Sequence, residues 1–283
     1  DLIDGAHAVH APEPFVSALL DDCIERGLTR QAGGVRYNFS GIFGVGLASA
    51  ADAMAAVKKV VFEDLSASLE ELLSALKDDF AGEGELLAQC AEAPKFGNNN
   101  DYVDLIARNI GHIFCKEVVQ YPCMRGGFYI PELHSVSTHV YFGELTGATP
   151  DGRKAGVPFS DGASPVGGRD VNGPTMAVAS MSKLDHMEVL QGVLFNQKFS
   201  PSLLNTPGAA VILADYVRAW CDLGGHHIQF NIVSSDELRR AQHNPNDYRN
   251  LIVRVAGYSA YFTELNENTQ NEIIARTEYE EMC

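Results

Sequence analysis

The sequence changes character at Gly126, and this change limits the folds that the chain can adopt. Before it, apolar residues recur at helical spacing, whereas after it short β-prone runs alternate with helical segments and with loops rich in glycine and proline. Strands that alternate with helices are typical of an α/β architecture. We therefore expect a helix-rich part over residues 1–125 and a β/α part over residues 126–283, joined in one continuous domain.

Helical periodicity predicts four helices in the first part, at residues 15–24, 47–62, 68–76 and 101–121. Ser68 and Glu71 form a capping box that opens the third of them. In the first, Cys23 shares the apolar face with Leu19 and Leu20, which is typical of a buried and unreactive thiol. We expect no chemistry from these helices.

The second part contains the loops that are long enough to carry function. Strands are expected at residues 134–143 and 226–233, and helices at 209–223, 236–242 and 247–252. A Pro-Asp-Gly turn falls within residues 149–153, and residues 160–170 form a long loop.

Charge and cysteine usage exclude several classes of function. A formal net charge of −16, with scattered basic residues, argues against binding to nucleic acid or to an anionic membrane. The apolar runs are too short to span a bilayer. The six cysteines form no CxxC pair and have no histidine at zinc-like spacing, so we expect a reduced, cytoplasmic protein without a metal site.

Two other candidate sites have simpler structural explanations. His226 and His227 would point to opposite faces of a strand, so one buried and one exposed histidine is expected rather than a metal site. Gly44 and Gly46 resemble a phosphate-binding loop only loosely, because no Lys-Ser or Lys-Thr follows them and no strand pattern precedes them.

Gly257 lies among aromatic and β-branched residues, where glycine weakens a strand. A bulge or close packing would explain it. Glycine also has a chemical property that no other residue shares, because a radical on its α-carbon can flatten without a clash from Cβ. The flanking amide nitrogen and carbonyl then delocalise the unpaired electron. The residues around Gly257 are compatible with a radical site, but they do not distinguish it from a bulge or close packing.

The segment RVAGYSAYF, residues 254–262, resembles the signature of the glycyl radical enzymes, the family of pyruvate formate-lyase and the B12-independent glycerol and diol dehydratases. Further segments are similar to the C-terminal part of these enzymes and occur in the same order. They are residues 12–27, 33–41, 135–156, 160–170, 182–186, 196–204, 222–234 and 273–279. The resemblance therefore covers nearly the whole chain.

The resemblance implies a fold and a role for single residues. The chain would form the C-terminal part of a ten-stranded β/α barrel of two antiparallel half-barrels wrapped by helices, with a glycyl radical domain at about residues 235–283. Gly257 would store the radical, which a separate activating enzyme with an iron-sulfur cluster and S-adenosylmethionine installs; no bound cofactor is implied. The residues expected to shape its loop without reacting are Arg254, Val255, Ala256, Tyr258 and Ser259.

The family passes its radical to a cysteine whose thiyl radical attacks the substrate. That cysteine lies upstream of the segment that contains Cys23, so Cys23 matches a different position. Because the chain starts at Asp1 without a methionine, we expect the C-terminal part of a longer, oxygen-sensitive enzyme of anaerobic metabolism.

The residues of these motifs resemble those of the dehydratase and C-X lyase branch of the family more than those of pyruvate formate-lyase. The resemblance therefore implies a dehydratase or C-X lyase that acts on a small polar organic substrate. Formate acetyltransfer, arylacetate decarboxylation and a non-catalytic radical-carrying subunit are the alternatives. Val136, Ser137 and Thr138 are candidate substrate neighbours on the strand expected at residues 135–140, although alternating core packing explains them equally well. The family also implies a homodimer.

Overall fold

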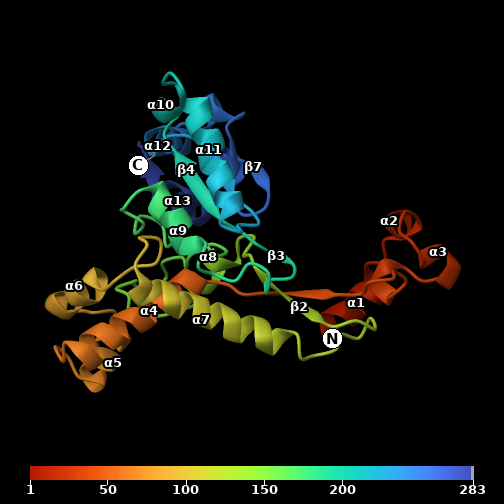
Figure 1. Ribbon diagram of the computed structural model, residues 1–283, viewed down its shortest axis with the longest axis horizontal. Coiled ribbons are helices and arrows are strands. Elements are labelled where there is room, and N and C mark those ends of the chain that lie inside the picture. Colours follow the sequence, from red (N-terminus) through yellow and green to blue (C-terminus); the bar gives the residue numbers. More distant parts are fainter. Residues whose placement is uncertain (282–283) are drawn as a thin grey trace.

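The computed structural model describes residues 1–281 and confirms the α/β class (Figure 1). Two parallel three-stranded sheets and one antiparallel hairpin form its β structure. The first sheet has the order β1 (Ser40–Phe43), β2 (Tyr129–Leu133), β3 (Gly192–Val193). The second has the order β5 (Gln229–Ile232), β4 (Asn196–Phe199), β8 (Glu278–Tyr279). The hairpin consists of β6 (Ile252–Arg254) and β7 (Ser259–Tyr261).

Helices surround these sheets. The first half contains α1 (Leu2–His10), α2 (Pro14–Ala18), α3 (Cys23–Arg26), α4 (Leu47–Val57), a π-helical turn (Lys58–Glu63), α5 (Leu69–Lys77), α6 (Gly84–Glu92) and α7 (Asp101–Val118). The second half contains α8 (Thr138–Glu144), α9 (Pro174–Met181), α10 (Pro201–Leu204), α11 (Ala209–Asp222), α12 (Ser235–His243) and α13 (Glu267–Ala275). Helices α1 to α3 form an arm at one end of the molecule, α5 and α6 project at the other, and the C-terminal half forms a separate lobe (Figure 1).

Local signals explain where several helices begin. The Ser68 hydroxyl accepts a hydrogen bond from the Glu71 amide while the Glu71 carboxylate accepts one from the Ser68 amide, so the predicted capping box is confirmed. At the start of α7, the side chain of Asn100 caps the amide of Tyr102. The predicted helices around residues 47–62, 101–121, 209–223 and 236–242 are likewise confirmed, whereas the helix expected at residues 247–252 is wrong, because a 3-10 turn covers Pro245–Tyr248 and β6 begins at Ile252.

The main core lies where α4 and α7 meet the ends of both sheets. Ala48, Ala51 and Ala55 of α4 are fully buried there, and their small side chains allow this helix to approach α7 closely. Phe195, Phe199 and Trp220 fill the part of the core beside β4 and α11. A smaller, separate core lies under the β6–β7 hairpin and is lined by Val253, Val255, Phe262, Ile273 and Leu238.

The structure corrects several sequence expectations. The strand predicted at residues 134–143 is wrong, because this segment turns at Val136, whose φ is +54°, and then forms α8. The single helix expected over residues 15–24 is broken into α2 and α3. Cys23 is buried as expected, whereas Leu19 is 73% exposed. A strand, β1, does precede Gly44, although no Lys-Ser or Lys-Thr follows the loop.

The exposed surface is larger than that of a compact protein. It measures 14,490 Å², whereas a compact monomer of this mass exposes about 11,900 Å². Apolar side chains of the arm contribute to the excess, with Leu2 and Phe15 93% and 79% exposed.

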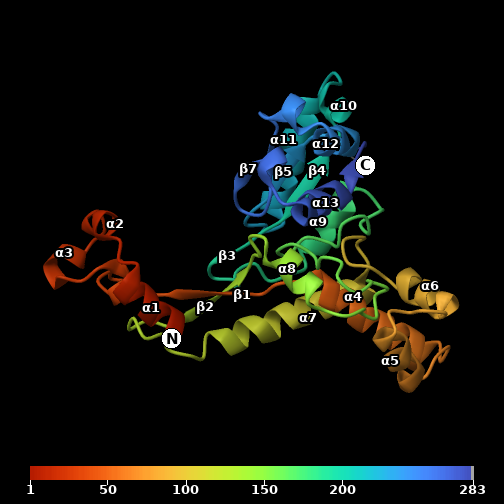
Figure 2. The ribbon, with the colours of Figure 1, turned by 180° about the vertical axis from the view of Figure 1, so that it is seen from behind.

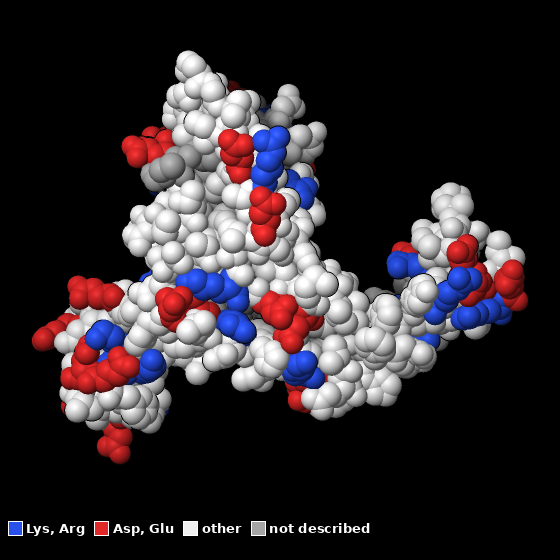
Figure 3. All heavy atoms as spheres, in the orientation of Figure 1, with Lys and Arg blue, Asp and Glu red and all other residues white. Residues whose placement is uncertain are grey.

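Acidic and basic side chains are intermingled on the face that Figure 3 shows, without a basic stripe. Within residues 1–281, no helix is both long enough and apolar enough to cross a bilayer.

Candidate functional site

Gly257 occupies the tip of the β6–β7 hairpin, which lies beside β5 (Figure 2). Arg254 pairs with Ser259, and the amide of Val255 donates a hydrogen bond of 2.9 Å to the carbonyl of Tyr258, which closes the turn. The φ of Gly257 is +79°, a left-handed conformation that side chains disfavour. The conformation of this turn therefore requires glycine before any chemistry is considered.

Three successive carbonyls of the glycine loop, residues 254–259, accept hydrogen bonds from side chains outside the loop. They belong to Arg254, Val255 and Ala256. The Arg254 carbonyl accepts from Asn231 at 2.8 Å and from Arg276 at 3.2 Å. The Val255 carbonyl accepts from Asn196 at 3.0 Å and from Arg276 at 2.9 Å. The Ala256 carbonyl accepts from His134 at 2.9 Å. These donors come from four separate places in the chain, so the backbone that leads to the glycine is fixed by tertiary contacts.

Arg276 is the centre of a buried ionic cluster behind this loop. Its guanidinium makes two hydrogen bonds of 2.8 Å with the Glu272 carboxylate and lies 3.5 Å from that of Asp161. Burial opposes ionisation of Glu272, but the charge of Arg276, together with the nearby His139, outweighs it and lowers the pKa of Glu272 to about 2. The pKa of Arg276 is raised by the same two carboxylates, against the effect of burial. Both partners are therefore charged, and the cluster holds the loop with charge-assisted bonds.

His134 covers Gly257 from the first sheet. Its Nε2 donates to the Ala256 carbonyl, and its Nδ1 lies 2.8 Å from the Glu132 carboxylate on β2. The ring also meets the edge of Phe43, with 5.6 Å between the centroids. Sequence reasoning missed this histidine because it had placed residue 134 at the start of an ordinary strand. A histidine directly after a strand, two positions beyond the carboxylate of Glu132, was the signal that could have found it.

The remaining loop residues hold the turn. Arg254 donates from Nη2 to Gln229, at 2.8 Å, and from Nη1 to Ser259, at 3.1 Å. Val255 and Ala256 are fully buried, and Tyr258 is half-buried against the small core.

Gly257 itself is exposed and faces a cavity of about 300 Å³. The cavity is lined by Glu132, His134, Gln191, Gly192, Val193, Leu194, His227 and Arg254. The small core lies behind the glycine loop, so within residues 1–281 the outer face of the loop borders this cavity. Burial, together with Arg254 and His134, lowers the pKa of His227, whose Nδ1 accepts a bond from the Phe195 amide. His226 is exposed, as expected.

The candidate substrate neighbours lie elsewhere. Val136, Ser137 and Thr138 form the turn into α8 and do not line the cavity at Gly257. They follow the C-terminal end of β2, the middle strand of the first sheet. Because the strand assignment is wrong, an alternating inward-facing pattern no longer supports their role.

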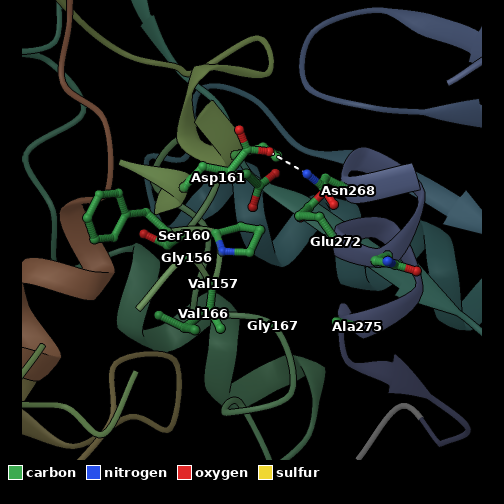
Figure 4. Close-up of a pocket in the computed structure, with 14 residues that line it drawn as sticks. Gly156, Val157, Ser160, Asp161, Val166, Gly167, Asn268, Glu272 and Ala275 are labelled. Carbon is green, nitrogen blue, oxygen red and sulfur yellow. Dashed lines mark hydrogen bonds between the residues drawn. The ribbon is translucent and has the colours of Figure 1, made fainter. Parts of the chain in front are cut away.

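A second cavity, of about 340 Å³, lies between α13 and the loop of residues 156–167 (Figure 4). Asn268 donates across it to Glu144, and Glu272 borders it near Asp161. The opposite wall is apolar and includes Val157. Since Glu272 is already paired with Arg276, this cavity presents no unpaired charge of that carboxylate to a ligand.

Cysteine and metal chemistry find little support in the described part of the chain. Cys23, Cys90, Cys115 and Cys123 are buried and Cys221 is exposed, all as free thiols, while Cys283 lies outside the described residues. None of these five cysteines lines the cavity at Gly257. Among residues 1–281, no group of three or more His, Cys, Asp and Glu side chains could hold a metal ion.

Comparison with known proteins places this geometry in a family. A model described as pyruvate formate lyase-like matches residues 1–143, and one described as glycine radical matches residues 159–263. Trans-4-hydroxy-L-proline dehydratase of Clostridioides difficile is 42% identical, covering 98% of this chain and 35% of that enzyme. For (2S)-3-sulfopropanediol dehydratase of Klebsiella oxytoca the identity is 36%, over 98% of this chain and 34% of the relative.

The solved structure of the glycerol-bound, B12-independent glycerol dehydratase from Clostridium butyricum is 49% identical, with a TM-score of 0.94 over 99% of this chain and 36% of that one. The chain thus spans about a third of the length of the proteins that it matches. The likeness in fold includes the region around Gly257, which lies within the glycine radical match. The chain belongs to the glycyl radical enzyme family.

Proposed function

We propose that this chain stores a radical on Gly257 and serves in a dehydratase or C-X lyase that acts on a small polar organic substrate. One observation carries the proposal: Gly257 stands at the tip of a hairpin whose three preceding carbonyls are fixed by side chains from distant parts of the chain. A structural turn needs no such support. A backbone radical does, because the orientation of its flanking peptide groups sets how far the unpaired electron spreads.

In this proposal, the glycine loop supports the radical and does not react with substrate. Arg254, Val255, Ala256, Tyr258 and Ser259 shape the turn through the contacts described above. Gly257 supplies the α-carbon, and the cavity beside it offers the space through which a hydrogen-donating group would reach it.

The cysteine that uses the radical is proposed to lie outside the described residues. Burial raises the pKa of Cys90 and of Cys115 to about 11, and each lies within a hydrophobic core away from the glycine cavity. Cys23 is buried within the arm, at the start of α3. The matched relatives are about three times as long as this chain, so they contain ample sequence for a cysteine loop.

The names of the relatives support the substrate class. Those named above act on hydroxyproline, sulfopropanediol and glycerol, and isethionate sulfite-lyase of Bilophila wadsworthia is 36% identical over 97% of this chain. All are small, polar molecules. Val136, Ser137 and Thr138 remain the proposed substrate neighbours, because they follow the end of the central strand of the first sheet.

A separate radical S-adenosylmethionine enzyme is proposed to install the radical. The proposal also retains two expectations from the sequence, a homodimer and a cytoplasmic location, which light scattering and cell fractionation would test. The decisive experiment is electron paramagnetic resonance after anaerobic activation of the whole protein that carries this chain. We expect a doublet from the remaining α-hydrogen.

The doublet should disappear in Gly257→Ala and persist in Gly147→Ala, a glycine with open space around it and no positive φ. Air should then cut the activated chain at Gly257, which gel electrophoresis would show as a short C-terminal piece. A doublet that survives in Gly257→Ala, or an intact chain after air in a sample with a verified radical, contradicts the assignment.

A further inference from the structure

His134 makes a closer approach to Gly257 than ordinary packing would allow for any residue with a side chain. A Cβ added to Gly257 would lie 2.5 Å from Nε2 and 2.9 Å from Cε1 of the imidazole, both far inside van der Waals contact. The ring therefore covers the side of the α-carbon on which an L side chain would stand. One of the two α-hydrogens of the glycine points at this ring.

The same ring holds the peptide group that precedes the glycine. Nε2 donates to the Ala256 carbonyl at 2.9 Å, and that carbonyl belongs to the peptide whose nitrogen is the nitrogen of Gly257. Nδ1 is bound by Glu132 at 2.8 Å, and Phe43 supports the edge of the ring. With both nitrogens engaged, the imidazole has one orientation, and the peptide plane that it binds is fixed with it.

The two peptide groups that flank Gly257 are held unequally. The Ala256 carbonyl has a donor, whereas no group within residues 1–281 donates a hydrogen bond to the Gly257 carbonyl. A radical on the α-carbon spreads into both groups, and each overlap depends on the angle of the corresponding peptide plane. Holding one plane therefore leaves only the other free to rotate when the α-carbon becomes planar.

The hydrogen bond also has an electronic effect. Donation to the Ala256 carbonyl draws electron density from the amide nitrogen that it shares with Gly257, and this nitrogen is one of the two groups that stabilise the radical. For Nε2 to donate, it must carry a hydrogen, and the contact of Nδ1 with Glu132 requires a second one. The Glu132–His134 pair therefore holds two protons when both bonds are made.

We propose that His134 is a positioning residue for the stored radical: it fixes the Ala256–Gly257 peptide plane and covers one face of the α-carbon. This inference rests on the proposed function. It concerns a residue outside the signature segment around Gly257, and it separates two contributions of one side chain, a hydrogen bond and a steric cover.

Three substitutions separate these contributions. His134→Gln keeps a donor of similar reach, His134→Phe keeps the flat cover without a donor, and His134→Ala removes both. His226→Ala is the matched control, because His226 is exposed and does not line the cavity at Gly257. Each whole protein is activated anaerobically with reduced activating enzyme and S-adenosylmethionine, and the doublet and its lifetime are recorded with and without air.

We expect His226→Ala and His134→Gln to retain the wild-type spectrum and lifetime. His134→Phe should change the hyperfine splitting and shorten the anaerobic lifetime by about fivefold, as the loss of one hydrogen bond implies. His134→Ala should share that change and also lose its radical faster in air than His134→Phe, because its cover is gone.

A wild-type radical whose spectrum and lifetime are unchanged in both His134→Phe and His134→Ala overturns this inference and leaves the proposed function intact. A wild-type protein that gives no doublet, with an activating enzyme proven on another substrate protein, overturns the proposed function and this inference together. If His134→Phe fails to fold, Glu132→Leu replaces it, because it removes the partner of Nδ1 and leaves the covering ring in place. An unchanged spectrum in Glu132→Leu and His134→Ala then refutes the inference.

Discussion

Replacing Arg276 by methionine would test whether the glycine loop depends on its ionic cluster. The side chain is 7% exposed, bonded to Glu272 and 3.5 Å from Asp161. Methionine removes the charge and both donors to the loop carbonyls of Arg254 and Val255, while it fills much of the same volume. Two carboxylates would then remain buried close to each other without a cation.

Removing one partner of a buried ion pair costs about 3–5 kcal/mol, because the other charge stays buried and unpaired. We therefore expect Arg276→Met to lower the free energy of unfolding by about that amount at pH 7. The matched control is Arg239→Met, because Arg239 pairs with Asp236 at the surface and is 57% exposed. It should change the free energy by no more than about 0.5 kcal/mol.

Urea denaturation followed by the fluorescence of Trp220, the single tryptophan of the chain, measures the global effect. Hydrogen exchange over residues 252–261 measures the local effect on the hairpin. A loss below about 1 kcal/mol, with exchange in the hairpin unchanged, would refute the view that the cluster holds the loop.

The same variant has a predicted acid dependence. The folded pKa of Glu272, about 2, lies below its ordinary value of 4.5, so the ion pair contributes fully above about pH 4.5 and its contribution is lost as the pH falls toward 2. The difference between the wild type and Arg276→Met should therefore shrink over this range. A difference that stays constant down to pH 2 would contradict the assigned charge states.

Two further predictions concern stability. Burial lowers the pKa of Lys198 from 10.5 to about 8, so between pH 8 and 10.5 the unfolded chain binds a proton that the folded chain does not. The free energy of unfolding, measured by urea titration relative to Lys198→Met, should therefore rise over this range by up to about 1.4 kcal/mol per pH unit. A difference between the two proteins that does not change with pH would refute this prediction. In Gly111→Ala, within α7, the added Cβ would meet no atom of another element within 4 Å, so this substitution should raise the free energy of unfolding by about 0.5–1 kcal/mol. In its counterpart Gly127→Ala, the added Cβ would lie 1.4 Å from the Asn38 carbonyl oxygen, which should lower the free energy of unfolding by about 1–3 kcal/mol. Thermal denaturation should therefore shift the melting temperatures of the two variants in opposite directions, and shifts of the same sign would contradict the packing described.

The sequence predicted those parts of the fold that local interactions determine. The capping box at Ser68 and the long amphipathic helix α7 follow from nearby residues alone. The family signature gave Gly257 as the candidate site, and the structure adds the reason for its backbone conformation. These features depend on neighbours within a few positions along the chain, or on an ordered motif.

The rest depends on partners that are far away in the sequence. In β4, Asn196, Gln197 and Lys198 are all buried, because each finds hydrogen-bond partners on other elements; a polar run of this kind does not show the alternation of a strand. Residues 134–143 alternate like a strand, yet a turn at Val136 and the burial of His139 on α8 override that pattern. Tertiary contacts, which no local pattern encodes, decided both cases.

The side chains that hold the glycine loop also imply an order of assembly. Arg276 and Asn231 lie within 23 positions of the carbonyls that they bind, Asn196 lies 59 positions away, and His134 lies 122 positions away. Closing a longer stretch of chain costs more entropy, so contacts between distant residues form late in folding. We therefore expect the β6–β7 hairpin to form first, together with α13, the helix that precedes Arg276. The imidazole of His134 should reach Gly257 among the last steps of folding.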